Sequence, residues 1–337
     1  MKGILLAIIA QVIPWYLFPG SAQEASVDIP DTVNVSLLLP LDASTEAGGS
    51  MFDFYSGALM AARDLGREGI RLSLKVYDVT KTGPESVSLA GSDIIIGPVS
   101  KSDMMRFLPF CPDGGHLISP LDPGNAALAD SLAVIQVPTP ADTLHSDLER
   151  WMKEECGPTD RCVVIRPPFA FGEIEGMCAA DSVTRFIVDS QDERFLSEAV
   201  RNVSVLSMLK YDVALYAPSR IRSFRNLNVE LMHEASTRIS TSYHIDYSDE
   251  RVIRFVYAYR ALFDAEPDSF AFQGYDILTY FTHICSKFGR DWFRNLPEYV
   301  ESGLQTDFNF EILNSAGAVN NASRRVVYNK DFSVTRK

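Results

Sequence analysis

The chain has 337 residues, of which 46% are hydrophobic and 22% are charged, and its formal net charge is −13. These values are ordinary for a folded water-soluble protein, and they exclude disordered, collagen-like and multi-span membrane chains. No run of lysine and arginine reaches the length of a nucleic-acid-binding patch, so the sequence predicts no nucleic-acid partner. The length predicts two domains, whose cores need no metal ion to be stable.

The first segment, residues 1–22, has the order of parts of a signal peptide. Lys2 precedes an apolar stretch over 4–18, and the small residues Gly20 and Ala22 follow it. The stretch is short for a membrane span and is interrupted by a glutamine and a proline. We predict cleavage after Ala22 and export of the mature chain to the periplasm or an equivalent compartment; an uncleaved N-terminal anchor is the alternative. Because no cysteine lies near this site, lipoprotein-type acylation is not expected.

Short apolar runs alternate with helical patterns in the first part of the chain. The alternation predicts βαβ units around a parallel sheet. The segment AVIQVPTP (133–140) contains two prolines and is interpreted as a stiff crossover. Buried strands are predicted at 33–41, 71–79, 93–99 and 116–120, and helices at 51–66, near 84–91 and from about residue 101.

A second series of the same kind follows. Strands are predicted at 161–167, 184–189 and 211–218. Helices are predicted before them at 141–155, between them at 193–209 and after them at 221–234. The last third begins with predicted helices at 251–265, 269–288 and near 291–302. The end of the chain is interpreted as a hairpin, in which 306–313 pairs with 324–330 and Gly317 lies in the turn.

Sequence signatures of catalysis are absent. There is no GxSxG elbow, HExxH, GxGxxG or P-loop, and the five histidines have no metal-ligand spacing. We therefore predict no catalytic residues, no metal and no cofactor. Of the five cysteines, Cys156 and Cys162 flank a short loop in which two thiols could meet, and the sequence leaves open whether they are bridged.

Loops at the carboxyl ends of strands are the natural places for a binding site, because ligands of open α/β sheets bind there. In one of them, Ser100 and Ser102 could cap the following helix, face a ligand, or do both. The candidate loops are 42–50, 97–104, 119–125 and 167–173.

Motifs in the segment FVYAYRALFDAEPDSFAFQGYDI (255–277) carry a family resemblance. Pro267, Ala271 and the triplet Gly274-Tyr275-Asp276 have the spacing found in the type I periplasmic binding-protein superfamily. The chain resembles in particular the amino-acid (Leu/Ile/Val-type) ABC-transporter substrate-binding proteins and the related receptor ligand-binding regions. The segments DIIIGPVS (93–100) and HLISP (116–120) agree with this resemblance, which covers nearly all of 33–330.

This resemblance implies an α/β fold of two Rossmann-like lobes joined by a three-segment hinge, with a ligand held in the cleft and hinge closure around it. The first lobe is expected to comprise residues 33–137 and 247–303. The second is expected to comprise residues 138–246 and 304–337.

The resemblance also implies where the ligand is held. In the family, small hydroxyl residues and backbone in the loops that match 97–104 and 119–125 hold the ligand. The second loop departs from that pattern, because Asp122 would repel a carboxylate and Pro123 has no N–H to donate. Phe171 matches an aromatic position of the family. The predicted ligand-binding residues are Ser100, Ser102, Leu121, Asp122, Phe171 and Tyr243.

These expectations describe an exported, non-catalytic protein that captures a small polar, amino-acid-like ligand for ABC-type uptake or sensing. Its partners would be the ligand and an ABC permease or another envelope protein. The alternative is a degenerate binding-protein fold that acts as an envelope scaffold or regulator through protein contacts. A hydrolase is a third interpretation that rests on the fold class alone, and it would require a cluster of serine, histidine and carboxylate side chains.

Overall fold

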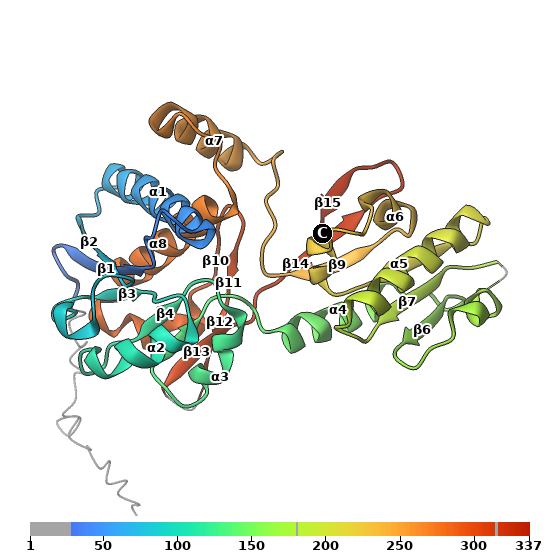
Figure 1. Ribbon diagram of the computed structural model, residues 1–337, viewed down its shortest axis with the longest axis horizontal. Coiled ribbons are helices and arrows are strands. Elements are labelled where there is room, and N and C mark those ends of the chain that lie inside the picture. Colours follow the sequence, from blue (N-terminus) through green and yellow to red (C-terminus); the bar gives the residue numbers. More distant parts are fainter. Residues whose placement is uncertain (1–27, 180, 314–315) are drawn as a thin grey trace, which may run out of the picture.

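Two α/β lobes lie side by side along the long axis of the molecule (Figure 1). The computed structural model describes residues 28–179, 181–313 and 316–337, and the predicted signal peptide, residues 1–22, lies outside them. Each lobe is built around one large sheet, and the described chain crosses between the lobes over 137–140, 242–249 and 321–323. The predicted α/β fold class is therefore confirmed.

The first lobe contains a sheet of seven strands in the described residues, in the order β12-β13-β5-β4-β3-β1-β2. Neighbouring strands are parallel except for β12 and β13, which are antiparallel. Helices cover both faces of the sheet, which explains the nearly continuous apolar runs of its central strands. The strands are β1 (Val33–Leu39), β2 (Leu72–Asp78), β3 (Ile94–Ile96), β4 (Leu117–Ser119), β5 (Val134–Gln136), β12 (Phe310–Leu313) and β13 (Gly317–Asn320).

The second lobe contains a sheet of six strands in the described residues, in the order β15-β14-β9-β8-β7-β6. Strands β6 to β9 are parallel, and β14 and β15 extend the sheet in antiparallel fashion. The strands are β6 (Arg161–Ile165), β7 (Thr184–Val188), β8 (Val213–Tyr216), β9 (Arg238–Thr241), β14 (Arg324–Tyr328) and β15 (Val334–Arg336); a small separate pair is β10 (Glu301–Ser302) with β11 (Asp307–Phe308).

Helices complete the layers of both lobes. In the first lobe, α1 and α8 cover one face of the sheet, and α2 and α3 cover the other. In the second lobe, α5 and α6 lie on one face and α4 on the other. The helices are α1 (Glu46–Arg67), α2 (Lys101–Phe107), α3 (Ala126–Ala129), α4 (Ala141–Glu155), α5 (Glu193–Met208), α6 (Val229–Glu234), α7 (Glu250–Phe263) and α8 (Ser269–Phe288).

Two glycines allow α1 and α8 to pack with their backbones in contact. A Cβ atom at Gly57 would lie 1.8 Å from the carbonyl oxygen of Ala271, and one at Gly274 would lie 1.9 Å from that of Phe54. Any side chain at either position would therefore push the helices apart. Gly274 is the first residue of the Gly-Tyr-Asp triplet, so this close approach gives that motif a physical reason.

The predicted hairpin at the end of the chain is wrong. Strand β12 pairs with β13 in the first sheet, whereas β14 pairs with β9 in the second. Gly317 begins β13 instead of lying in a turn, and a Cβ there would lie 2.3 Å from the carbonyl oxygen of Ala129. The chain consequently passes to the second lobe after Asn320, not after residue 303, because 310–320 complete the first sheet.

The crossovers are hydrogen-bonded to one another. The N–H of Thr139 donates to Ser242 Oγ at 2.9 Å, and the Thr139 hydroxyl donates to the carbonyl oxygen of Ala322. The N–H of His244 donates to the carbonyl oxygen of Gln305 at 3.0 Å. These bonds connect the segments about which the two lobes can rotate.

Two buried ionic side chains hold the chain beside these crossovers. Asp276, the last residue of the triplet, accepts N–H bonds of 2.7–2.9 Å from Leu304, Gln305 and Thr306. Burial raises the pKa of the Asp276 carboxyl to about 6, although the three N–H donors favour its ionised form. Arg324 donates to the carbonyl oxygen of Leu304 at 2.9 Å and pairs with an Asp307 carboxylate oxygen at 2.7 Å.

Candidate functional site

A cavity of about 470 Å³ opens at the carboxyl ends of β8 and β9, beside the start of α4. This is the edge of a parallel sheet at which α/β proteins bind ligands. The second lobe supplies most of the walls, and the first lobe supplies Pro123. The lining residues are Pro123, Pro138, Thr139, Ala141, Leu144, His145, Leu148, Gln191, Pro218, Ser219, Arg220, Arg222, Ser223, Ser240, Thr241, Ser242 and Tyr243.

A second cavity of about 360 Å³ continues from the first. Arg222 and Tyr243 line both cavities, so these two residues stand where the cavities meet. We call the two cavities together the interlobe cleft, because residues of both lobes and of the crossovers line them. The second cavity is lined by Leu121, Arg222, Tyr243, His244, Ile245, Ser269, Phe270, Gln273 and Gln305.

Arg222 is the cation at the junction. Its Nη2 donates to Thr241 Oγ1 at 2.7 Å and to the carbonyl oxygen of Tyr243 at 3.0 Å. Within the described part of the chain, no carboxylate oxygen lies within 4.0 Å of its guanidinium nitrogens. Burial among protein atoms lowers the pKa of Arg222, but a guanidinium keeps its charge at neutral pH. Arg222 is thus a fixed positive charge held by neutral oxygens.

Tyr243 lies on the second crossover, where its backbone forms an isolated bridge with Thr306. Its hydroxyl is buried and finds no hydrogen-bond partner among the described residues. Burial raises the pKa of this phenol, so it stays protonated. A buried hydroxyl without a partner costs about 1–3 kcal/mol, so Tyr243, which lines both cavities, carries an unsatisfied polar group.

The charge of the interlobe cleft contrasts with the net charge of the chain. Its lining includes Arg220, Arg222, His145 and His244, and none of its lining residues in the described structure is aspartate or glutamate. Burial, assisted by Arg222 and Arg324, lowers the pKa of His244 to about 4. His244 is therefore neutral at neutral pH, and Arg220 and Arg222 supply the positive charge of the lining in a protein whose formal net charge is −13.

Two of the predicted site residues, Leu121 and Tyr243, line the interlobe cleft. Ser100 and Ser102 line neither of its cavities: Ser100 caps α2 by accepting the Asp103 N–H at 3.1 Å, and the two serine hydroxyls lie 2.9 Å apart. The helix-capping role left open by the sequence is the one that the structure displays.

The other two predicted residues also have partners outside the cleft. Asp122 accepts the N–H of Gly124 at 2.8 Å and starts the 3-10 turn Pro123–Asn125. Phe171 packs against Phe169 and Phe195, with ring centroids 5.1 and 5.3 Å apart. Both residues lie at strand-end loops, as predicted, but their side chains serve the local structure.

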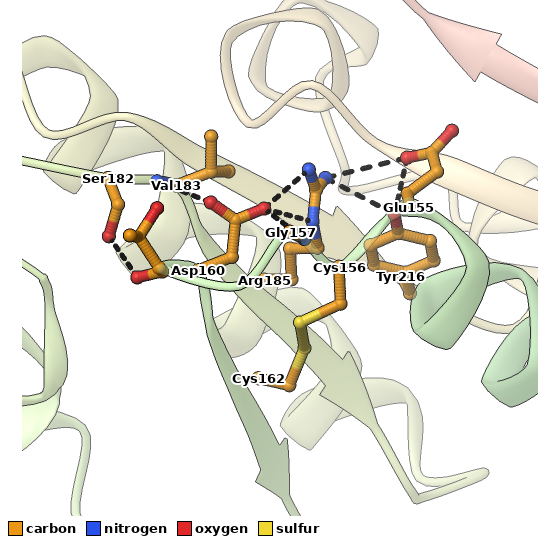
Figure 2. Close-up of a disulfide and its surroundings, with 10 residues drawn as sticks. Glu155, Cys156, Gly157, Asp160, Cys162, Ser182, Val183, Arg185 and Tyr216 are labelled. Atoms are coloured by element: carbon orange, nitrogen blue, oxygen red, sulfur yellow. Dashed lines mark hydrogen bonds and ion pairs between the residues drawn. A yellow bond between two sulfur atoms is a disulfide. The ribbon is translucent and has the colours of Figure 1, made fainter.

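Cys156 and Cys162 are joined by a disulfide, which links the end of α4 to β6 (Figure 2). Beside it, Arg185 donates to Asp160 at 3.0 Å and reaches Glu155 at 3.5 Å. This cross-linked group lies at the end of α4 opposite to the residues that line the cleft, so it stabilises the second lobe without contributing to the site.

Sequence reasoning missed Arg222 and its partner Thr241. The signal that could have found Arg222 was its position just after the predicted strand 211–218, at a carboxyl end like the four loops that were selected. Thr241 ends β9, which was not predicted.

A larger cavity of about 630 Å³ lies on the outer side of the first lobe, between α1, α7 and α8. Its charged side chains neutralise one another: Asp64 pairs with Arg67 at 2.9 Å, and His283 lies 3.0 Å from both Glu68 and Glu301. This cavity lies away from the strand ends, so we place the candidate site in the interlobe cleft.

In the described ranges, no group of three or more histidine, cysteine, aspartate or glutamate side chains is arranged to hold a metal ion. A search of the same residues for a long apolar helix that could cross a membrane finds none.

Two α/β lobes linked by three crossovers, with a cleft between them, define the fold of the type I periplasmic binding proteins, and the predicted fold is confirmed. No protein-family model matches the sequence, and no curated protein does either. Solved structures do match. One, described as a branched-chain amino acid ABC transporter from Rhodospirillum rubrum, has a TM-score of 0.63 and 14% identity, and the match covers 91% of this chain and 100% of that one.

Two further matches illustrate the range of similar proteins. The ABC transporter substrate-binding protein from Desulfitobacterium hafniense in complex with Leu has a TM-score of 0.52 and 14% identity over 91% of this chain and 100% of that one. Full-length LpoA from Haemophilus influenzae has a TM-score of 0.59 and 13% identity over 92% of this chain and 59% of that one. At these identities the similarity establishes the fold alone.

Proposed function

We propose that the protein is an exported, non-catalytic solute-binding protein that captures a small polar ligand in the interlobe cleft for ABC-type uptake or sensing. The observation that carries this proposal is the pair of cavities that meet at Arg222 and Tyr243, between two lobes that share hydrogen-bonded crossovers. The similar solved structures, several of which are described as ABC transporter binding proteins, support it.

Closure of the lobes would be the mechanism. A ligand favours the closed form only through contacts that are stronger there than in the open form. A shift from 1:99 to 99:1 needs about 5.5 kcal/mol of differential binding. About two to four hydrogen bonds to charged groups, at about 1.5–3 kcal/mol each, are sufficient. Arg222 provides such bonds from the second lobe, and Leu121 and Gln273 face it from the first.

Export is the second part of the proposal. It rests on the signal-peptide pattern of 1–22 and on the disulfide between Cys156 and Cys162, since structural disulfides are typical of oxidising compartments. N-terminal sequencing of the secreted mature protein tests it. The expected first residue is Gln23, and recovery of the uncleaved chain in the cell interior contradicts export.

The binding function is tested by a thermal-shift screen of small metabolites against the mature protein, followed by small-angle X-ray scattering. A ligand that raises the melting temperature is expected to lower the radius of gyration as the lobes close. A screen in which no compound changes either quantity contradicts the proposal.

A second candidate function is an envelope scaffold or regulator. The observation that favours it is the similarity to the C-domain of LpoA from Haemophilus influenzae, which is described as a regulator of PBP1A and has a TM-score of 0.55 with 13% identity. Cross-linking in envelope extracts distinguishes the two functions. A partner captured equally well by the unliganded protein and by a variant with a blocked cleft supports the regulator.

A further inference from the structure

We propose that the interlobe cleft selects a small organic monocarboxylate without an α-ammonium group, and that Arg222 anchors the carboxylate. This inference rests on the proposed solute-binding function and names the chemical class of its ligand.

The first argument is the pattern of charges. The lining of the interlobe cleft contains two arginines and two histidines and, among the described residues, no carboxylate. The carboxylates nearest to its imidazoles belong to Glu149 and Asp189, at 3.5 and 3.9 Å from His145 Nε2, and neither lines the cavities. The two arginines therefore attract an anion, and none of the described lining residues is itself a counter-charge for an ammonium group.

The second argument is the state of Arg222. Of its guanidinium nitrogens, Nη2 makes the hydrogen bonds to Thr241 and Tyr243, whereas Nε and Nη1 have no partner in the described residues. Arg222 is surrounded by protein atoms on one side and keeps accessible surface beside the cavities. The planar guanidinium is thus held in place through Nη2. The N–H groups of Nε and Nη1 can donate the two parallel hydrogen bonds that a carboxylate accepts.

The third argument concerns the body of the ligand. Leu144, Leu148 and the prolines Pro123, Pro138 and Pro218 form apolar walls in the first cavity. An apolar chain or ring suits these walls, while the hydroxyls of Ser219, Ser223 and Ser240 are compatible with a neutral polar substituent. Arg220 also lines this cavity, but its Nη1 donates to the carbonyl oxygen of Gln191 at 2.6 Å. The guanidinium of Arg222 beside apolar walls matches a single carboxylate better than a highly charged phosphate.

The same cleft gives an α-amino acid no advantage over the corresponding simple acid. An ammonium group placed beside the carboxylate would lie near Arg222 and would meet neutral oxygens only. The repulsion between like charges in a partly buried site would weaken its binding.

Three probes of one shape test the proposal: 4-methylpentanoate, its amide 4-methylpentanamide, and L-leucine, which adds the α-ammonium group. A second pair, cyclohexanecarboxylate and its carboxamide, covers a wider body. Isothermal titration calorimetry with the mature protein is expected to show at least one of the two carboxylates binding about tenfold or more tightly than its amide, and 4-methylpentanoate binding more tightly than L-leucine.

The matched variants are Arg222→Gln and Arg225→Gln, which remove the same charge three positions apart. Arg225 does not line either cavity of the cleft. Arg222→Gln is expected to weaken carboxylate binding about tenfold or more, and Arg225→Gln to leave it within about twofold. Should Arg222→Gln fail to fold, Arg222→Lys keeps the charge without the planar fork and is expected to weaken binding by a smaller factor.

Amides or L-leucine that bind as tightly as the carboxylates, or carboxylate binding equal in the Arg222 and Arg225 variants, overturn the inference. If such neutral or zwitterionic ligands also lower the radius of gyration, the proposed solute-binding function stands while the carboxylate selectivity fails. If neither carboxylate binds but the metabolite screen finds another ligand, the inference fails alone. If nothing binds, both fail.

Discussion

The N–H of Thr139 donates a 2.9 Å hydrogen bond to the hydroxyl oxygen of Ser242, and this bond joins the first crossover between the lobes to the second. Both residues are buried, with 2% and 9% of their surface exposed. The Thr139 hydroxyl in turn donates to Ala322 on the third crossover. A single pair of side chains therefore connects the segments that any lobe movement must bend.

Removal of that link is expected to destabilise the protein. Ser242→Ala leaves the buried Thr139 N–H without an acceptor, so the free energy of unfolding should fall by about 1–2 kcal/mol in a urea titration. Ser88→Ala, at an exposed position, serves as the control and should change it by less than about 0.5 kcal/mol. Equal effects of the two substitutions would show that the Thr139–Ser242 bond does not contribute to stability.

A substitution at Ser100 distinguishes helix capping from ligand binding. Ser100→Ala removes the acceptor for the Asp103 N–H at the start of α2, and the free energy of unfolding should fall by about 1 kcal/mol. The affinity for any ligand identified in the screen should stay unchanged in calorimetry, because Ser100 lines neither cavity of the cleft. Lys101→Ala, in the same helix turn, is the control for stability. A loss of affinity without a loss of stability would show that Ser100 contacts the ligand and is not only a helix cap.

Two of the histidines with shifted pKa values, His244 and His283, should give opposite pH effects. The pKa of His244 is lowered to about 4 by burial and by Arg222 and Arg324, so the unfolded chain takes up this proton first. Neutral His244 therefore contributes to the free energy of unfolding above about pH 6.5, and this contribution is lost as the pH falls towards 4. His244→Gln should therefore flatten the fall in urea midpoint between pH 7 and pH 5.

His283 should behave in the reverse sense. A hydrogen bond to Glu301, with further help from Glu68, raises the pKa of His283. Protonated His283 stabilises the folded protein fully below the pKa of the unfolded chain, and this stabilisation is lost as the pH rises through the pKa of the folded protein. His283→Gln should therefore steepen the fall in urea midpoint between pH 7 and pH 5. Identical pH profiles for the two variants would contradict both assignments.

The disulfide between Cys156 and Cys162 should contribute modestly because it closes a short loop. A loop of this length predicts that Cys156→Ser with Cys162→Ser lowers the free energy of unfolding by about 2 kcal/mol. Chemical denaturation of the oxidised protein, the reduced protein and the double variant checks this. Reduced and doubly substituted proteins that are as stable as the oxidised one would show that the bridge adds nothing.

Much of the fold could be predicted because its signals are local. Helix α4 occupies the predicted 141–155, and α8 the predicted 269–288, since both carry long apolar faces and have clear ends. By contrast, β5 and β9 were missed: they have three and four residues, too few to show a period, and two prolines follow β5 closely. Their identity as strands depends on the neighbours with which they pair.

The hairpin error has the same origin. The segments 306–313 and 324–330 both carry strand patterns, and a sequence cannot state which of two sheets each one joins. The short predicted helix near 84–91 is only a 3-10 turn, Pro84–Ser86, and the predicted helix 221–234 is divided into the 3-10 turn Ser219–Ser223 and α6. Local propensity was outweighed by tertiary packing in these places.

The site was predictable only in its general location. Leu121 lies in the selected strand-end loop 119–125 and lines the candidate cleft, whereas Tyr243 lines it from outside the four selected loops. Serines at such loops are needed as helix caps, and Ser100 fulfils that need. Arg222 belongs to the cleft because the second crossover brings Tyr243 beside it and the segment between β10 and β11 brings Gln305, which is a property of the folded chain.

The position of β12 and β13 in the first sheet has a consequence for the order in which the protein is made. Strands β6 to β9, with the helices between them, are one uninterrupted stretch that ends at Thr241. The sheet that contains the earliest strand, β1, lacks an edge until Asn320 has been synthesised. Both parallel cores therefore stay incompletely paired until the end of the chain is made: β1 to β5 wait for β12 and β13, and β6 to β9 wait for β14 and β15.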